Sequence, residues 1–431
     1  MILRLGRSAE RLALILVAVG LAVELGYFSV RNAVAVYYAN LATRHGYERA
    51  TQLEPGNPLN WFLLGRYWQY NLDEPDNPRA IKVYLTALSL DPRSAGTWLD
   101  LANAYELEGD LSAARNAFLQ AKRVYPLSAE VSWRYGNFLL RQGELPMAFA
   151  EIRRAVTADP KRAAEAFSRC WRVDPDIQVI LDNVLPADGG VYLDAIRELD
   201  ADAEIGPALA VWSRLVSLHP RLSLNDVIPF TDMLIFARRY ADAQRVWGEA
   251  AALSGTPSTG DTPGSVLWDG GFESGVSGGG FAWTFASLST GVQVAIDSKE
   301  KHSGRRSLQL GFDGKHNVNF ADVCHLAIVE PATTYRFSAW VRTQALSTDQ
   351  GIRFRLDWFE DARGFSIETP ETHGTQPWTK VEMPWTATAS VHTVRVCVSR
   401  DPSDIYGSRI HGTAWVDDVA LVPESPAGTK P

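Results

Sequence analysis

The apolar residues of this chain follow three patterns in succession, and each pattern predicts a different structure. Residues 12–30 form an almost unbroken apolar run with a single charge, Glu24. From residue 31 to residue 253, apolar side chains recur at the spacing of amphipathic helices. From residue 266 to residue 424, short alternating runs lie between Gly, Pro and Asp turns, as in antiparallel strands. The order predicts a multidomain chain with a transmembrane helix, an all-α region and an all-β domain.

The apolar run at the N-terminus is long enough to cross a membrane, because a helix over residues 12–30 would measure about 28 Å. Arg4, Arg7 and Arg11 precede it, so the positive-inside rule predicts a cytoplasmic tip, residues 1–30 as tip and anchor, and an exported remainder. One alternative is a cleaved signal peptide, for which Ala22-Val23-Glu24 is a poor cleavage site. The other is a buried amphipathic helix, which would need a polar face that this run lacks. We expect an uncleaved anchor.

A longer period overlies the helical spacing of residues 31–253. Pro92, Pro126 and Pro160 recur every 34 residues. Between the first two lie, in order, Trp98, Leu101, Ala102, Tyr105, Gly109, Ala114, Phe118 and Ala121. This order resembles the tetratricopeptide repeat, and the units on either side repeat it. The resemblance implies five or six stacked helical hairpins that form a solenoid, since no unit buries its apolar face alone. Residues 161–204 fit the pattern least.

The resemblance also implies a groove for a protein partner on the concave face of the solenoid. The residues expected to project there from the first helix of each unit are Phe62, Arg66, Tyr70, Leu99, Asn103, Leu107, Trp133, Asn137 and Arg141. In relatives that grip peptides, an Asn at the position of Asn103 and Asn137 holds peptide backbone. The basic clamp that holds a C-terminal carboxylate in some relatives is replaced by Leu99 and Trp133. The alternative is that these residues pack against a neighbouring helix or the other domain.

Residues 254–265, rich in Gly, Ser, Thr and Pro, predict a flexible linker. The motifs that follow it are Asp269-Gly-Gly-Phe-Glu273, Phe281-Ala-Trp283, His302-Ser-Gly304, the strand Thr334–Val341, Trp378-Thr-Lys380 and Trp415-Val-Asp417-Asp418-Val419. Their order resembles the jelly-roll carbohydrate-binding modules attached to bacterial xylanases and cellulases. The resemblance implies a β-sandwich over residues 266–424, followed by a tail of residues 425–431.

In such modules a structural calcium often joins the first and last strands. The resemblance implies that Glu273 would bind it together with Asp417 or Asp418, because carboxylate oxygens suit Ca²⁺. The alternative is that these acids are solvated or hydrogen-bonded turn residues.

A glycan site on this domain would need polar side chains beside an aromatic platform. Alternation points Ile352, Phe354, Leu356 and Trp358 into the core and places their neighbours on the opposite face. The resulting candidates are Asn319, Arg353, Arg355, Asp357 and Arg395, with Trp340 or Phe359 as the stacking surface. An exposed sheet with cross-strand charge pairs is the alternative.

Net charge and cysteine spacing exclude some kinds of partner and binding site. The net charge of −8 argues against a nucleic-acid partner. Cys170, Cys324 and Cys397 have no metal-ligand spacing. An oxidising compartment would permit a bond between Cys324 and Cys397, but the sequence leaves open whether they come close enough.

Motifs of common enzyme classes are absent from the sequence, so we expect a protein that is not an enzyme. The patterns predict a single-pass protein of the bacterial inner membrane with its bulk in the periplasm. Its repeats would bind a protein partner and its sandwich a polysaccharide in envelope or exopolysaccharide assembly. The alternatives are a protein–protein assembly factor whose sandwich binds no sugar and a divergent glycan-processing enzyme.

Overall fold

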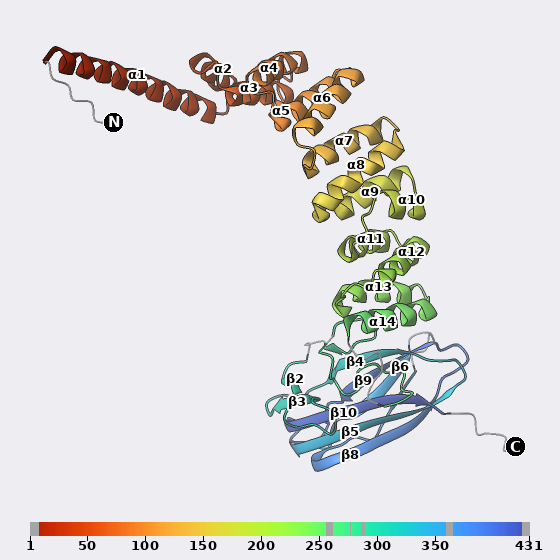
Figure 1. Ribbon diagram of the computed structural model, residues 1–431. Coiled ribbons are helices and arrows are strands. Elements are labelled where there is room, and N and C mark those ends of the chain that lie inside the picture. The colour runs from red at the N-terminus through yellow and green to blue at the C-terminus, as the bar shows by residue number, and fades with distance from the viewer. Residues whose placement is uncertain (1–7, 256–261, 276, 286–288, 359–364, 425–431) are drawn as a thin grey trace. The chain divides into compact units, whose positions relative to one another are not determined.

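The computed structural model of the protein describes residues 8–255, 262–275, 277–285, 289–358 and 365–424 (Figure 1). The chain forms two compact units that divide after Pro186. The helices of the described residues are α1 (Ser8–Asn40), α2 (Arg44–Leu53), α3 (Pro58–Tyr70), α4 (Asn77–Leu90), α5 (Ala95–Leu107), α6 (Leu111–Val124), α7 (Ala129–Arg141), α8 (Leu145–Ala158), the 3-10 helix η1 (Pro160–Arg162), α9 (Ala163–Val173), α10 (Ile177–Asn183), α11 (Gly189–Ala201), α12 (Ile205–Ser217), α13 (Leu224–Phe236) and α14 (Tyr240–Ser254). The strands are β1 (Thr284–Phe285), β2 (Val292–Asp297), β3 (Ser307–Asp313), β4 (Phe320–Ile328), β5 (Thr334–Leu346), β6 (Arg353–Trp358), β7 (Phe365–Glu368), β8 (Gly374–Thr386), β9 (Thr393–Arg400) and β10 (His411–Pro423).

Helix α1 passes without a break from the apolar run into the first helical pair of the chain. Its segment Arg11–Asn40 is long and apolar enough to cross a membrane, and its most apolar window is left uncovered by the rest of the protein. Beyond the run, α1 packs against α2, where Ala35 is fully buried. Gly46 lies so close to the carbonyl oxygen of Tyr38 that a Cβ at this position would collide with it. The first pair is therefore a direct continuation of the apolar helix.

Helices α3 to α8 form the three antiparallel pairs that the 34-residue period predicts. A Cβ added at Gly65 would lie 2.5 Å from the Tyr84 ring, and one at Gly136 would lie 2.8 Å from the Ile152 side chain. Glycine at these positions thus lets the two helices of a pair approach closely. Helices α4, α6 and α8 each end two residues before the repeated proline. The pairs α9–α10, α11–α12 and α13–α14 follow, and the described residues from α3 to α14 therefore contain six pairs.

The second compact unit contains α11 to α14 as well as all ten strands. The indole ring of Trp247 on α14 meets the rings of Trp268 and Phe281 edge to face, at 5.3 and 5.9 Å between centroids. The backbone N–H of Gly280 donates a hydrogen bond of 2.7 Å to Asp232 on α13. The last helices thus pack directly on the start of the β domain. Half of the expected linker, residues 256–261, and the expected tail, residues 425–431, lie outside the described residues, as do residues 1–7 of the expected cytoplasmic tip.

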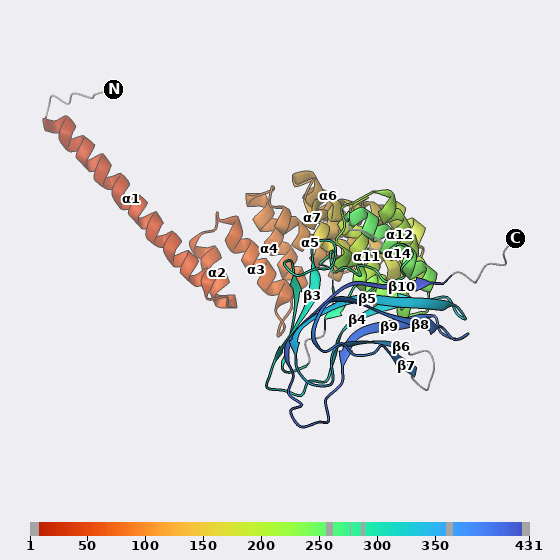
Figure 2. The ribbon, with the colours of Figure 1, turned by 90° about the horizontal axis from the view of Figure 1, so that it is seen from below.

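Two antiparallel five-stranded sheets form the predicted β-sandwich, seen as two layers in Figure 1 and from below in Figure 2. One sheet has the order β1-β4-β9-β6-β7, and the other has the order β2-β3-β10-β5-β8. The core between them is apolar and buried. It contains Phe354 and Leu356, which alternation predicted to point inward, together with Val394, Val396 and Val398 of β9. The remaining residues of β6 and β9 therefore define the outer face of the first sheet.

Candidate functional site

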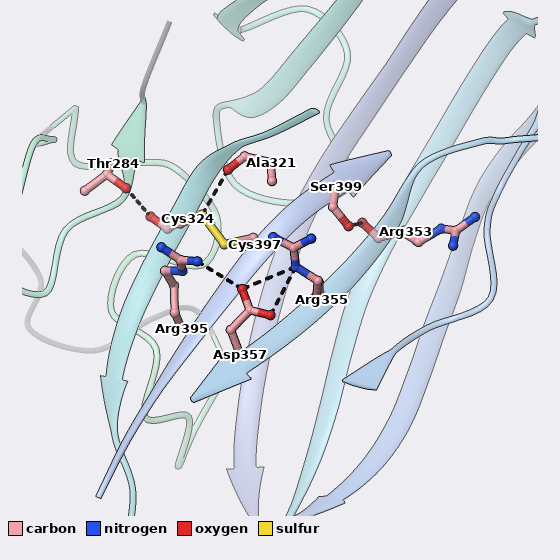
Figure 3. The surroundings of a disulfide bond; sticks show 9 residues. All are labelled: Thr284, Ala321, Cys324, Arg353, Arg355, Asp357, Arg395, Cys397 and Ser399. Atoms are coloured by element: carbon pink, nitrogen blue, oxygen red, sulfur yellow. Dashed lines mark hydrogen bonds and ion pairs between the residues drawn. A yellow bond between two sulfur atoms is a disulfide. The ribbon is translucent and has the colours of Figure 1, made fainter. Parts of the chain in front are cut away.

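A disulfide lies on the outer face of the β1-β4-β9-β6-β7 sheet. The register of β4 and β9 sets Cys324 directly opposite Cys397. Their Cα atoms are 4.1 Å apart, and the two sulfur atoms are bonded (Figure 3). Both side chains belong to the outward set of their strands, yet both are buried. The structure thus shows that Cys324 and Cys397 come close enough to form a bond, which the sequence left open.

Beside the disulfide, two guanidinium groups share one carboxylate. Asp357 of β6 accepts hydrogen bonds from Nε of Arg355 at 3.2 Å and from Nη2 of Arg395 at 3.1 Å. The register of β6 and β9 brings Arg395 directly opposite Asp357. The carboxylate is nearly buried, whereas the Arg355 and Arg395 side chains are 28% and 39% exposed. Arg355, Asp357 and Arg395 therefore form one cluster with two partly exposed guanidinium groups (Figure 3).

Arg353 lies on the same face but is surrounded by acids. Its guanidinium contacts the carboxylates of Asp401 at 2.8 Å, Glu368 at 3.1 Å and Glu371 at 3.9 Å. Its side chain is only 14% exposed. Sequence reasoning missed these three acids, because they lie on a short strand and in loops where no alternation fixes their direction. Arg353 is thus committed to contacts within the domain.

The structure brings Arg353, Arg355, Asp357 and Arg395 together as predicted, but it does not bring the aromatic platform to them. Trp340 lies on β5, in the other sheet, where its ring stacks on that of His302 at 3.8 Å. The outward faces of the two sheets of a sandwich point in opposite directions. The prediction that Trp340 lies beside these polar residues was therefore wrong. Asn319 is exposed just before β4, and its carbonyl accepts a hydrogen bond from Ser289. Phe359 lies outside the described residues.

The acids expected to bind calcium hold a loop by hydrogen bonds instead. Asp417 accepts bonds from the backbone N–H groups of His302 at 2.7 Å and Ser303 at 3.1 Å. Asp418 pairs with the His302 ring at 2.6 Å, and Glu273 accepts from the backbone N–H groups of residues 305 and 306. Burial raises the pKa of Asp417 to about 6. Within the described ranges, no group of three or more His, Cys, Asp or Glu residues could hold a metal ion. In this arrangement the acids serve as hydrogen-bond acceptors, and the calcium site stays a prediction.

Part of the groove predicted on the helical repeats is present as a hollow of about 390 Å³. Four of the predicted residues line it, together with Gln69 and Glu106: Tyr70, Asn103, Leu107 and Arg141. A second hollow of about 270 Å³ lies on the other side of Tyr70 and includes Arg66, Tyr47 and Ala42. Partial burial raises the pKa of Tyr70. These hollows offer amide, phenol and apolar groups to an extended segment.

Charged residues on successive first helices link the repeats beside these hollows. Asp100 is almost fully buried and contacts Arg134 at 2.7 Å and Arg66 at 3.5 Å. Arg141 forms a two-pronged pair with Glu106, at 2.7 and 2.8 Å. Each pair spans about one repeat in the sequence, so these contacts fix the stacking of neighbouring units.

The other predicted groove residues are less accessible. Leu99, Trp133 and Asn137 are 3%, 8% and 7% exposed. Asn137 accepts a hydrogen bond of 2.7 Å from Arg169, and the guanidinium groups of Arg162 and Arg169 lie over the Trp133 ring. Phe62 is half-buried against Tyr84. The prediction that Leu99, Trp133 and Asn137 face a partner was therefore wrong, because these side chains are buried within the repeats.

Comparisons with known proteins match one family to the helical repeats and another to the β domain. The family model for tetratricopeptide repeats matches residues 72–123 and 108–163, and the model for the carbohydrate-binding domain matches residues 264–404. The anaphase-promoting complex subunit CDC16 of Saccharomyces cerevisiae is 33% identical over 78 residues, which are 18% of this chain and 9% of that protein.

Two solved structures show a weaker similarity. YrrB, a TPR protein with an unusual peptide-binding site, is 13% identical with a TM-score of 0.26, covering 49% of this chain and 94% of that one. The module TmCBM61 in complex with β-1,4-galactotriose is 21% identical with a TM-score of 0.26, covering 37% of this chain and 99% of that one. The chain thus carries tetratricopeptide repeats followed by a C-terminal domain of the carbohydrate-binding type.

Proposed function

We propose that this protein is a membrane-anchored binding scaffold of the bacterial envelope. In this proposal α1 crosses the inner membrane once, the repeats and sandwich lie in the periplasm, and the protein takes part in envelope or exopolysaccharide assembly. The length and apolar character of α1 support the anchor. The Cys324–Cys397 bond supports an oxidising compartment, because disulfides persist mainly outside the cytoplasm. The two matched families bind ligands, which supports binding rather than catalysis.

We propose an acidic polysaccharide as the ligand of the sandwich. The guanidinium groups of Arg355 and Arg395 carry this proposal, because they lie side by side at Asp357 and stay partly exposed on an outward face. Guanidinium groups pair with carboxylates in a two-pronged geometry, so a uronic acid would suit this cluster. Without Trp340 in the groove, ionic contacts would dominate the binding, and salt would weaken it.

The test compares binding of the full chain in detergent to polygalacturonate and to neutral xylan. Replacing both arginines with alanine (R355A/R395A) should weaken polygalacturonate binding at least tenfold, as expected when about 1.4 kcal/mol or more is lost. Arg336→Ala is the matched control, because Arg336 is exposed and pairs with Glu424 on the other sheet. Equal binding by the double variant, or no binding by the natural chain, would rule out this ligand class.

A protein partner is proposed for the two hollows beside Tyr70. The observation behind this proposal is the set of exposed polar and apolar groups there, Tyr70 and Leu107 being 47% and 65% exposed. The second candidate function is a protein–protein assembly factor whose sandwich binds no sugar. The three acids around Arg353 favour it, because they leave that cation no free charge. Retention of the polysaccharide by the natural chain would decide against this candidate.

A further inference from the structure

Glu24 is an acidic residue within the apolar part of α1. It lies six residues before Val30, the end of the apolar run, which is about 9 Å along the helix. Side chains of a helix tilt toward its N-terminus, so the carboxylate of Glu24 points away from the nearer end of the run. For a span whose N-terminus is cytoplasmic, this direction leads deeper into the membrane. A charged group there is costly unless it finds a partner.

Within the described residues, the chain supplies no cation for Glu24. Arg31 is seven residues away, about 10 Å along the axis, and its guanidinium lies over the rings of Phe28 at 4.7 Å and Tyr27 at 5.9 Å. Arg11 is thirteen residues away, about 20 Å. The residues of α1 around Glu24 are exposed along their whole length, and none of the described elements covers them. A cation that pairs with the Glu24 carboxylate would therefore come from another molecule in the membrane.

The same face of α1 is open to close approach. Gly20 precedes Glu24 by four residues and lies about 40° from it around the helix, whereas Gly26 lies about 160° away. No atom lies within 4 Å of a Cβ built at Gly20. A small residue such as Gly20 lets a second helix approach the backbone. Glu24 and Gly20 thus mark one face for helix packing.

We propose that this face, which presumes the membrane anchor proposed above, binds a transmembrane helix of a partner protein that carries a Lys, Arg or His at the depth of Glu24. Charge complementarity selects this occupant. A second copy of the chain in a parallel pair would set two Glu24 carboxylates at the same depth, where like charges repel.

The test places a benzophenone amino acid at Val17 or Val19 of the full chain in membranes of the producing bacterium. Val17 lies about 20° from Glu24 and Val19 about 140°, and both are well exposed, at 61% and 55%. Irradiation should give an adduct from Val17 but not from Val19. Mass spectrometry should map the adduct to a membrane-spanning segment with a basic residue. Glu24→Leu and Gly20→Leu should reduce its yield at least fivefold, while Gly26→Leu should not.

A charge exchange completes the test. Glu24→Lys should abolish the adduct, and replacing the basic residue of the partner with Glu should restore it. Equal adducts from both positions, an adduct to a second copy, or a yield that Glu24→Leu leaves unchanged would overturn the proposal. Extraction with alkaline carbonate distinguishes failure of the anchor from failure of the partner. Release of the natural chain from membranes would refute the anchor itself. A chain that stays anchored but gives no expected adduct would refute only the helix partner.

Discussion

The disulfide between β4 and β9 should contribute strongly to the stability of the sandwich. Replacing both cysteines (C324S/C397S) removes a link between residues 73 positions apart. The loop-entropy relation gives about 4 kcal/mol for a loop of this length, because the link restricts the unfolded chain. For a unit of this size, about 2–4 °C is lost per kcal/mol. We therefore expect the melting temperature to fall by about 10–15 °C.

Calorimetry of the full chain would measure this change, with and without dithiothreitol. The reductant should lower the transition of the natural chain and leave that of C324S/C397S unchanged. Cys170→Ser is the control, because Cys170 is a buried free cysteine on α9 and burial raises its thiol pKa to about 12. A fall of less than about 1 kcal/mol in the double variant, or an equal effect of dithiothreitol on both proteins, would refute the reasoning.

Three further predictions concern the acids of the protein. Asp100→Asn should lower the free energy of unfolding of the repeats by about 1–3 kcal/mol in urea titrations, because two arginines lose a buried partner. Glu165→Gln, at an exposed position, should change this free energy little. Equal effects of the two substitutions would contradict the role of Asp100. The pKa of Asp417 is raised in the folded state to about 6 from 3.8, so the folded sandwich takes up a proton between pH 6 and 4. The free energy of unfolding should therefore fall by up to about 3 kcal/mol as the pH rises through this window. Calorimetry should show that Asp417→Asn reduces this slope, and an unchanged slope would contradict the assignment. Finally, because backbone N–H groups occupy the carboxylate of Glu273, we expect Ca²⁺ and EDTA to leave the melting temperature unchanged. A rise of several degrees with Ca²⁺ would show that Glu273 and its neighbouring acids rearrange to bind the ion.

Sequence patterns predicted the elements of this fold well, because local periodicity carries that information. The 34-residue spacing of Pro92, Pro126 and Pro160 located the ends of three helices to within two residues. Alternation correctly predicted that Phe354 and Leu356 point into the core. Each of these predictions depends only on neighbours along the chain, since the side-chain direction repeats with the period of the element.

The candidate site was predicted less completely, because it depends on which elements meet in space. Trp340 and Arg353 lie on strands that follow one another in the sequence, yet β5 and β6 belong to different sheets. Alternation gives the face of each strand but not its sheet. Similarly, the spacing of Leu99 and Trp133 gave their side of the helix, but only the structure shows that later helices cover them.

The unbroken course of α1 has a mechanical consequence. A helix that enters the first repeat without a hinge, and is clamped there by buried Ala35 and the close contact at Gly46, transmits rotation instead of absorbing it. In the membrane-anchored arrangement proposed above, tilting or turning the apolar segment would swing the first repeats by the same angle. In that arrangement α1 is a rigid lever between the bilayer and the hollows beside Tyr70.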